Sequence, residues 1–182
     1  MDAAAKEAAV AQFLREYPEA TQAERDHPAL LGCLDAAWSQ IPGCPAGIPA
    51  LFEGLLDQAA APEALRVLGN VLMDSVFHAS AAMPTALPFL LRLAANPDIA
   101  VRSGLVDLVV VAAELSQPVA ADNDRMVLLL GNDGDHPERE QCRAAFIEHA
   151  SLVHVLLIDE RPPGGLISAD DRESLLNAVA PR

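Results

Sequence analysis

The chain has 182 residues, of which 52% are apolar and only 4% aromatic, so its core must be built mainly from Leu, Val and Ala. Its formal net charge of -14 at pH 7 repels nucleic acid and anionic membranes and favours a basic protein as partner. We therefore expect no nucleic acid and no membrane among its ligands. Because Ala and Leu are strong helix formers, the composition predicts a single all-α domain over residues 1–182.

Residues 1–40 are expected to form N-terminal capping helices. Apolar residues recur at helical spacing over residues 2–16, and Pro18 ends that helix. The charged loop TQAERDH follows, and Pro28 opens a second helix. The apolar stripe of this second helix is Leu30, Leu31, Leu34 and Trp38. Trp38, the only tryptophan, is expected to anchor this part on the segments that follow. The N-terminus lacks a basic start and an apolar stretch, so no signal peptide is expected.

Residues 48–116 are expected to alternate between short and long helices. The short helices are predicted at 49–60 and 84–95, and the long ones at 62–81 and 97–116. The short helices begin alike, as GIPALFEGLL and ALPFLLRLAA, and the long ones share a pair that reads Leu-Arg in the first and Val-Arg in the second. Helix pairs that recur at about 40 residues are typical of an α-solenoid, so we expect two repeat units here.

One stretch of this region is similar to a known family. The segment LPFLLRLAANPDIAVRSGLVDL resembles a HEAT repeat, with an Asn-Pro-Asp turn followed by Val-Arg at the start of the second helix. The longer run His78–Leu115 resembles a group of bacterial HEAT-like proteins, many of them actinobacterial. The resemblance implies a short right-handed α-solenoid of antiparallel helix pairs. It also implies that Asp98 and Arg102 form a structural ion pair between repeats, and that Arg66 repeats the role of Arg102 one unit earlier.

The C-terminal third begins with an expected acidic loop at residues 117–137. This loop contains the apolar run Met126–Leu130 between two acidic patches, and irregular segments of this length are often functional. The apolar run is expected either to fill the core or to form a self-association interface. Helices are predicted again over residues 138–180, with a stop at the segment RPPGG and a last helix at 168–179. The apolar side of the first of these helices is Cys142, Ala145, Phe146, Leu152, Val153 and Leu156.

The first candidate site is a polar stripe on the two long helices. Its residues recur every fourth position on the first helix and more sparsely on the second, and the resemblance places both stripes on the concave surface. They are Arg66, Asn70, Asp74 and His78 on the first helix, and Ser103, Asp107 and Glu114 on the second. The stripe is either a groove that binds a partner or an ordinary solvated face.

Asp74 and His78 are four residues apart, which also suits a metal pair or an acid–base dyad. Metal binding needs three or four ligands, and catalysis needs a nucleophile or a third orienting group. The sequence shows neither at a matching spacing, so a hydrogen-bonded Asp–His pair is favoured, and no metal or cofactor is expected.

The second candidate site is the acidic loop. Its carboxylates are Asp122, Asp124, Asp133, Asp135 and Glu138. The stretch NDGDHPE is similar to a calcium loop, but Gly134 follows too few candidate ligands and Glu138 comes too early for an EF-hand. An acidic loop for a basic partner, or simple solvation, is the favoured interpretation.

Three cysteines, Cys33, Cys44 and Cys142, have unrelated spacings, which favours free thiols in a reducing cytoplasm over a disulfide framework or a zinc site. No catalytic motif such as HExxH, GxGxxG, a Walker loop or GxSxG is present.

The sequence therefore favours a non-catalytic protein-binding module whose acidic surface clamps a basic protein. The narrowest version is an immunity protein or antitoxin that neutralises a basic toxin. One alternative is a self-associating scaffold or regulator, and the oligomeric state is left open. Another alternative is an enzyme of the HEAT-like lyase type, which needs a reactive cysteine or a carboxylate in the groove. A HEAT-like glycosylase is not expected, because it needs a basic, aromatic groove that this chain does not offer.

Overall fold

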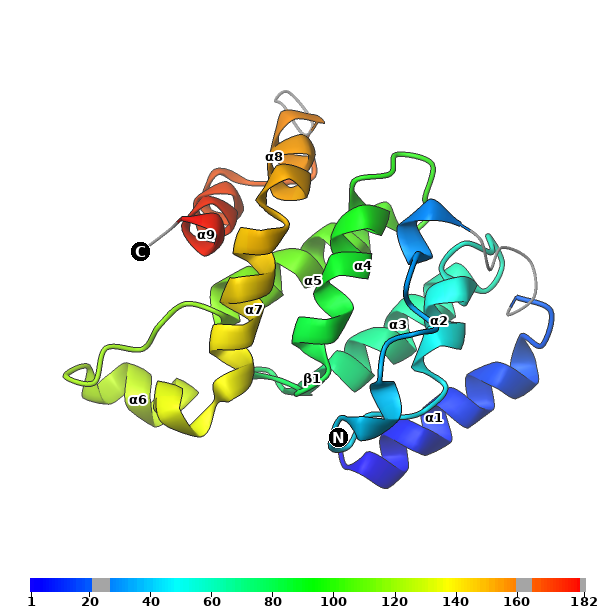
Figure 1. The fold of residues 1–182 in the computed structure, drawn as a ribbon, viewed down its shortest axis with the longest axis horizontal. Helices are drawn as coiled ribbons and strands as arrows, with labels where there is room; N and C mark the ends of the chain where they lie inside the picture. Colours follow the sequence, from blue (N-terminus) through cyan, green and yellow to red (C-terminus); the bar gives the residue numbers. More distant parts are fainter. Residues whose placement is uncertain (21–26, 160–164, 181–182) are drawn as a thin grey trace.

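The structure is a computed structural model that describes residues 1–20, 27–159 and 165–180 (Figure 1). Most of the expected charged loop and most of the expected helix stop at RPPGG lie outside these ranges. The described helices are α1 (Ala3–Glu16), α2 (Ile48–Gly54), α3 (Ala61–Leu72), α4 (Met83–Ala94), α5 (Arg102–Leu115), α6 (Asp124–Leu130), α7 (Pro137–Glu148), α8 (Ala150–Asp159) and α9 (Ala169–Val179). The short 3₁₀ turns are η1 (Pro28–Leu30), η2 (Trp38–Gln40) and η3 (Asp133–Asp135), and the two short strands are β1 (Met73–Ser75) and β2 (His78–Ala79). The predicted all-α class is confirmed.

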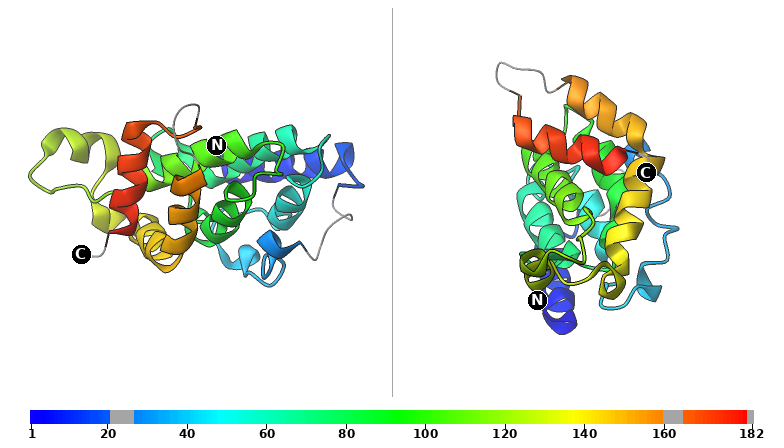
Figure 2. Two further views of the ribbon diagram at one scale, coloured as in Figure 1. Left: turned by 90° about the horizontal axis from the view of Figure 1, so that it is seen from above. Right: turned by 90° about the vertical axis from the view of Figure 1, so that its left-hand side faces the viewer.

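The helices lie in two layers (Figure 2). Helices α1, α3 and α5 form one layer, and α2, α4 and α7 form the other. Helix α2 packs on α3, and α4 packs on both α5 and α7. The two helix pairs expected in residues 48–116 are therefore present, with the short predicted helices at α2 and α4 and the long ones at α3 and α5.

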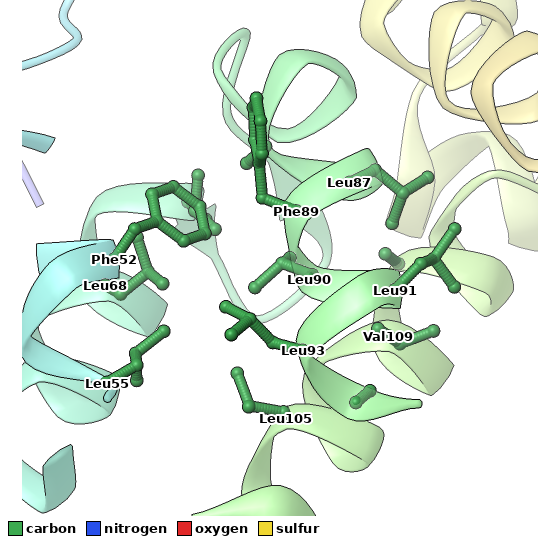
Figure 3. Close-up of a cluster of buried hydrophobic side chains, with 14 of the residues drawn as sticks. Phe52, Leu55, Leu68, Leu87, Phe89, Leu90, Leu91, Leu93, Leu105 and Val109 are labelled. Atoms are coloured by element: carbon green, nitrogen blue, oxygen red, sulfur yellow. The ribbon is translucent and has the colours of Figure 1, made fainter. Parts of the chain in front are cut away.

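The core between the layers is one cluster of buried side chains that runs from the N-terminal helix to the last one. Leu, Val and Ala make up most of it, as the composition predicts, and Figure 3 shows the leucines of α4 beside Phe52 of α2, Leu68 of α3 and Leu105 of α5. Trp38 is buried, and its ring centroid lies 6.0 Å from that of Phe52 and 6.1 Å from that of Phe89. The predicted anchoring role of Trp38 is thus confirmed.

The helix expected after Pro28 does not form. In its place are the 3₁₀ turns η1 and η2, and the predicted stripe is split, because Leu31 and Leu34 are 78% and 60% exposed. Gly32 adopts a φ of 82°, a left-handed conformation that ends a right-handed helix. Trp38 is held by a different contact, in which its Nε1 donates to the Cys33 carbonyl at 2.7 Å.

The prediction of one long helix at 62–81 is also wrong for the second half of that range. Helix α3 ends at Leu72, and the chain then forms the β1–β2 hairpin. A continuing helix would give the Val71 carbonyl to the amide of Ser75, but the buried Lys6 Nζ donates to that carbonyl at 2.8 Å. The Leu72 carbonyl accepts from the amide of Ser80 instead, at 2.8 Å. Lys6 of α1 and Ser80, directly after β2, thus bond two carbonyls that the end of α3 leaves open.

The segment expected as an irregular acidic loop contains a helix. Asn123 caps α6 by accepting a hydrogen bond from the Met126 amide at 3.2 Å, and Gly131 ends it with a φ of 72°. No residue of α6, all of which are described, is buried. The expectation that Met126–Leu130 fills the core is therefore wrong.

The C-terminal helices follow the prediction more closely. The expected apolar side is buried at Cys142, Phe146, Val153 and Leu156. The one predicted helix is divided into α7 and α8, which meet at residues 149–150. Helix α9 begins with a capping box in which Ser168 and Asp171 bond each other's backbone amides.

The structural pair expected from the family resemblance is not formed. Arg102 Nε donates to the Ala94 carbonyl at 2.8 Å, which ties the start of α5 to the end of α4. Asp98 lies in the turn between them, where its amide donates to the Asn96 side chain at 3.0 Å. No ion pair joins Asp98 to Arg102, both of which are described.

Candidate functional site

A groove with a volume of about 600 Å³ lies between α3, the β1 strand and α5. Four residues of the predicted polar stripe line it, together with apolar and small side chains. The polar ones are Arg66, Asn70, Asp74 and Asp107, and the others include Leu65, Gly69, Met73, Val76, Gly104, Leu108 and Val111. Arg66 and Asn70 on α3 and Asp107 on α5 thus line one groove, as the stripe predicts, whereas Asp74 lines it from β1. A groove of this size with an apolar floor and a few polar groups is typical of a binding site.

Two glycines shape the floor of this groove. A Cβ atom on Gly104 would lie 2.4 Å from Cδ2 of Leu65, so the glycine allows α5 to approach Leu65 closely. A Cβ on Gly69 would meet no atom within 4 Å. Gly69 therefore exposes the backbone of α3 to the open space of the groove.

Some charged side chains of the groove are already paired within the chain, and others are left to bind a ligand. Arg66 is engaged in two hydrogen bonds to Glu63, from Nε at 2.8 Å and from Nη2 at 2.5 Å. This hydrogen bonding lowers the pKa of Glu63 and raises the pKa of Arg66. Asp107 is exposed and has no hydrogen bond or ion pair with any residue that the structure describes. The N-terminal amine of Met1 also lines the groove and donates to the Asp74 carbonyl at 3.2 Å, so the unpaired side-chain charge left for a ligand is the carboxylate of Asp107.

Asp74 is held in place by a residue far away in the sequence. Lys6, the only lysine, is 3% exposed, and its Nζ donates to Asp74 Oδ1 at 2.5 Å as well as to the Val71 carbonyl. This pair fastens α1 to the end of α3 and the start of β1. Because the Asp74 side chain is 54% exposed, its second oxygen is left for a ligand.

A second hollow, with a volume of about 410 Å³, adjoins the groove at Asp74 and Ser75. It is lined by residues from the hairpin and from the segment that leads into α7. They are Asp74, Ser75, His78, Ala79, Ala81, Asp135, His136 and Glu138. Residues of the predicted stripe and of the predicted acidic loop thus lie together in one hollow, although they were predicted as two separate sites.

Two histidines lie against each other in the wall of this hollow. The ring centroids of His78 and His136 are 4.6 Å apart. His78 Nδ1 is 2.8 Å from Ser75 Oγ, and His136 Nδ1 is 2.9 Å from Glu138 Oε1. The predicted Asp74–His78 hydrogen bond is therefore wrong, because Asp74 bonds Lys6 and His78 Nδ1 lies against Ser75 Oγ, although both residues line the same hollow. Within the described ranges, no group of three or more His, Cys, Asp or Glu residues is arranged to hold a metal ion.

The carboxylates of the acidic loop have different surroundings. Asp133 accepts from Arg139 Nη1 at 2.7 Å and from the Val119 amide at 3.2 Å. Partial burial raises the pKa of Asp133, but the hydrogen bonds outweigh it and the net pKa is lowered. Glu138 is engaged with His136. The outward carboxylates of the loop are the exposed Asp122, Asp124 and Asp135.

The remaining residues of the predicted stripe lie outside both cavities. Ser103 and Glu114 are exposed on α5 but line neither the groove nor the hollow. The sequence analysis missed Val76 and Phe77, which form the tip of the hairpin and are 83% and 45% exposed. Asp74 and Ser75 are weak helix formers, because their side chains compete with helical hydrogen bonding, but two such residues do not by themselves predict a hairpin.

The three cysteines are poor nucleophiles in the folded chain. Burial raises the pKa of Cys33 and of Cys142 to about 12, and that of Cys44 to about 11. A thiol with so high a pKa carries almost no thiolate near neutral pH. None of the three lines the groove or the second hollow.

Comparison with protein-family models finds no match, and comparisons with curated proteins and with solved structures find no similar protein. None of the described helices has the length and apolar character that crossing a bilayer requires. The functional argument therefore rests on the groove, the hollow and their charges.

Proposed function

We propose that the protein is a non-catalytic binding module that receives a basic segment of a partner protein along the groove and the adjoining hollow. The observation that carries this proposal is the position of Asp74, which lines both cavities and makes them one continuous surface. Asp107 at one end and Asp135 at the other add exposed carboxylates. Apolar side chains of α3 and α5 form the floor between the polar groups.

The charges support a cationic partner. Two cations line the groove, and both are engaged within the chain: Glu63 binds Arg66, and the N-terminal amine of Met1 donates to the Asp74 carbonyl at 3.2 Å. A Lys or Arg side chain would gain from Asp107 and Asp135 without displacing an internal ion pair, since neither carboxylate has one. Carboxylates at the rim of a site act mainly on the association rate and on specificity. The net charge of -14 acts in the same direction, because it attracts a basic partner.

The narrow form of the proposal is an immunity protein or antitoxin, built as a short HEAT-like solenoid and located in the cytoplasm, where its buried thiols stay reduced. The two-layer arrangement of the helix pairs α2–α3 and α4–α5 is consistent with such a solenoid. The lyase alternative has less support, because Cys142 is buried and no cysteine lines the groove.

The test compares the wild-type chain with the double variant Asp107→Asn/Asp135→Asn. The matched control is Glu7→Gln/Asp35→Asn, which removes the same charge from exposed positions outside both cavities. Each chain is immobilised, and proteins captured from the host lysate are compared by mass spectrometry. The expected result is a basic protein retained by the wild type and the control but lost from the double variant. Equal capture by all three chains would refute the proposed site.

The immunity-protein version has its own test. The product of the adjacent reading frame is expressed alone and together with the wild-type chain. Growth arrest that is relieved by the wild type, and not by Asp107→Asn/Asp135→Asn, is the expected outcome. A neighbouring product that is acidic, or harmless on its own, contradicts this version and leaves the binding module to be judged by the capture experiment.

A further inference from the structure

Helix α6 presents an apolar face that the chain itself does not cover. Leu128 is 85% exposed, and Met126 and Leu129 are also exposed. A helix of seven residues is too short to be stable by itself in water. It is held at its ends, by the Asn123 cap and by Arg139 Nη2, which donates to the Leu130 carbonyl. The fold therefore fixes α6 in place while leaving its apolar residues free.

Such a patch marks an interaction surface. Its surroundings indicate the chemistry of the occupant, because acids precede and follow the helix. Asp122 and Asp124 lie at its start, and Asp133 and Asp135 follow its end. Arg125, the only base within it, is exposed one turn before Leu128 and Leu129 on the same face. A second copy of the chain would bring the same acids face to face, and anionic lipid would be repelled for the same reason. A cationic segment with an apolar side can bury the exposed leucines and pair with the acids at the same time.

The apolar helix is also continuous with the hollow. The ring of His136, which lines the hollow, packs on Gly131 at the end of α6, where a Cβ would lie 2.5 Å from His136 Nε2. Asp135 in the hollow wall is the last residue of η3, the turn that follows α6 in the chain. A single partner segment can therefore place cations at the hollow and continue over the leucines of α6.

We propose that α6 docks a cationic amphipathic helix of the basic partner, with the apolar side of that helix on Met126, Leu128 and Leu129. This inference rests on the proposed function and specifies its partner. The occupant is a helix because α6 has no free backbone edge to pair with a strand, so recognition must come from side chains, as in helix-on-helix packing. The charges beside the apolar strip then set the orientation of the docked helix.

The test uses three synthetic peptides of about four helical turns. The first is built from Leu and Lys with all leucines on one face, the second replaces every Lys by Glu, and the third has the composition of the first with the leucines scattered. Binding is measured by fluorescence anisotropy at near-physiological salt. The expected order of affinity is amphipathic Lys peptide first, scattered Lys peptide well below it, and no binding of the Glu peptide.

Chain variants then locate the contact. Leu128→Gln/Leu129→Gln should weaken the amphipathic Lys peptide by about tenfold or more, because two exposed leucines no longer become buried. Leu31→Gln is the matched control, since Leu31 is an exposed leucine directly after η1, a segment that lies at the opposite end of the molecule from α6 (Figure 1). Both changes are at exposed positions, so the chain should stay folded, which circular dichroism verifies. The control should bind as the wild type does.

Other outcomes overturn the inference in distinguishable ways. If only Asp107→Asn/Asp135→Asn weakens binding, the proposed function stands and the α6 contact is refuted. If only the leucine variant weakens it, α6 is the docking site and the groove is not. A peptide-free dimer in light scattering that Leu128→Gln/Leu129→Gln abolishes identifies a second copy as the occupant. Binding to uncharged lipid vesicles that is lost in the same variant identifies a bilayer.

Discussion

Gly69 offers the most direct test of whether the groove is open space in the folded protein. It lies inside α3, where glycine destabilises a helix by roughly 0.5–1 kcal/mol relative to alanine. A Cβ at this position would meet no atom within 4 Å, so Gly69→Ala adds no clash. The free energy of unfolding should therefore rise by roughly 0.5–1 kcal/mol, which corresponds to about 1–4 °C in Tm for a chain of this size. Urea and thermal unfolding followed by far-UV circular dichroism measure both quantities.

Gly54→Ala is the contrasting variant. A Cβ on Gly54 would lie 2.5 Å from Cζ of Phe13 and 3.2 Å from Cβ of Ala64, and the Phe13 ring is fully buried. Because the ring has no free space to move into, overpacking should cost about 1–3 kcal/mol and exceed any gain in helix propensity. If Gly69→Ala is destabilised as strongly as Gly54→Ala, the groove is filled in solution and the reasoning about the site fails.

The same position separates stability from binding. Gly69→Leu retains the gain in helix propensity but projects a large side chain into the groove. The variant should unfold at or above the temperature of the wild type, yet lose affinity for the amphipathic Lys peptide. Equal affinity would place the partner on another face.

Three further predictions concern contacts around the site. Asp133 has a lowered pKa in the folded chain, so its contribution to stability is complete above the ordinary Asp pKa of about 3.9 and is lost as the pH falls through the folded pKa. NMR of the α6 amides should follow this loss of stability, and the pH dependence should be absent from Asp133→Asn. Lys6→Met leaves the Val71 carbonyl without its donor, and urea unfolding should show a cost of about 1–3 kcal/mol. Burial raises the pKa of Cys142 to about 12, so a thiol-specific reagent at mildly alkaline pH should label it only after denaturant is added, and rapid labelling of the native chain would contradict the buried placement.

Local signals were enough to predict several elements. Helices α4 and α5 lie within or close to their predicted ranges, because apolar periodicity and the intervening Pro-Asp turn are both written in the local sequence. Ser168 and the acids after it correctly predicted the start of α9. The start of α6 at Asn123 and its end at Gly131 carry the same kind of capping signals, and the acidic composition of the region obscured them.

The hairpin after α3 could not be predicted in this way. Residues up to 81 continue the helical periodicity, yet the helix ends at Leu72, where Lys6, 65 positions earlier, bonds the Val71 carbonyl that the helix leaves open. A contact of that kind depends on the packing of α1 against α3, which no local pattern records. The exposure of α6 could not be predicted either, since an apolar run has the same sequence pattern whether it is buried in the core or exposed for a partner.

This hairpin also explains why two predicted sites became one surface. Had α3 continued, Asp74 and His78 would have stayed on one helical face with Arg66 and Asn70. Instead the chain reverses after Ser75, which keeps Asp74 at the edge of the groove and carries His78 onto His136 beside Asp135. Lys6 is therefore the residue on which the continuity of the binding surface depends, although it lines neither cavity. We expect Lys6→Met to weaken the binding of the Lys peptide beyond what its loss of stability explains, because it frees the hairpin that joins the groove to the hollow.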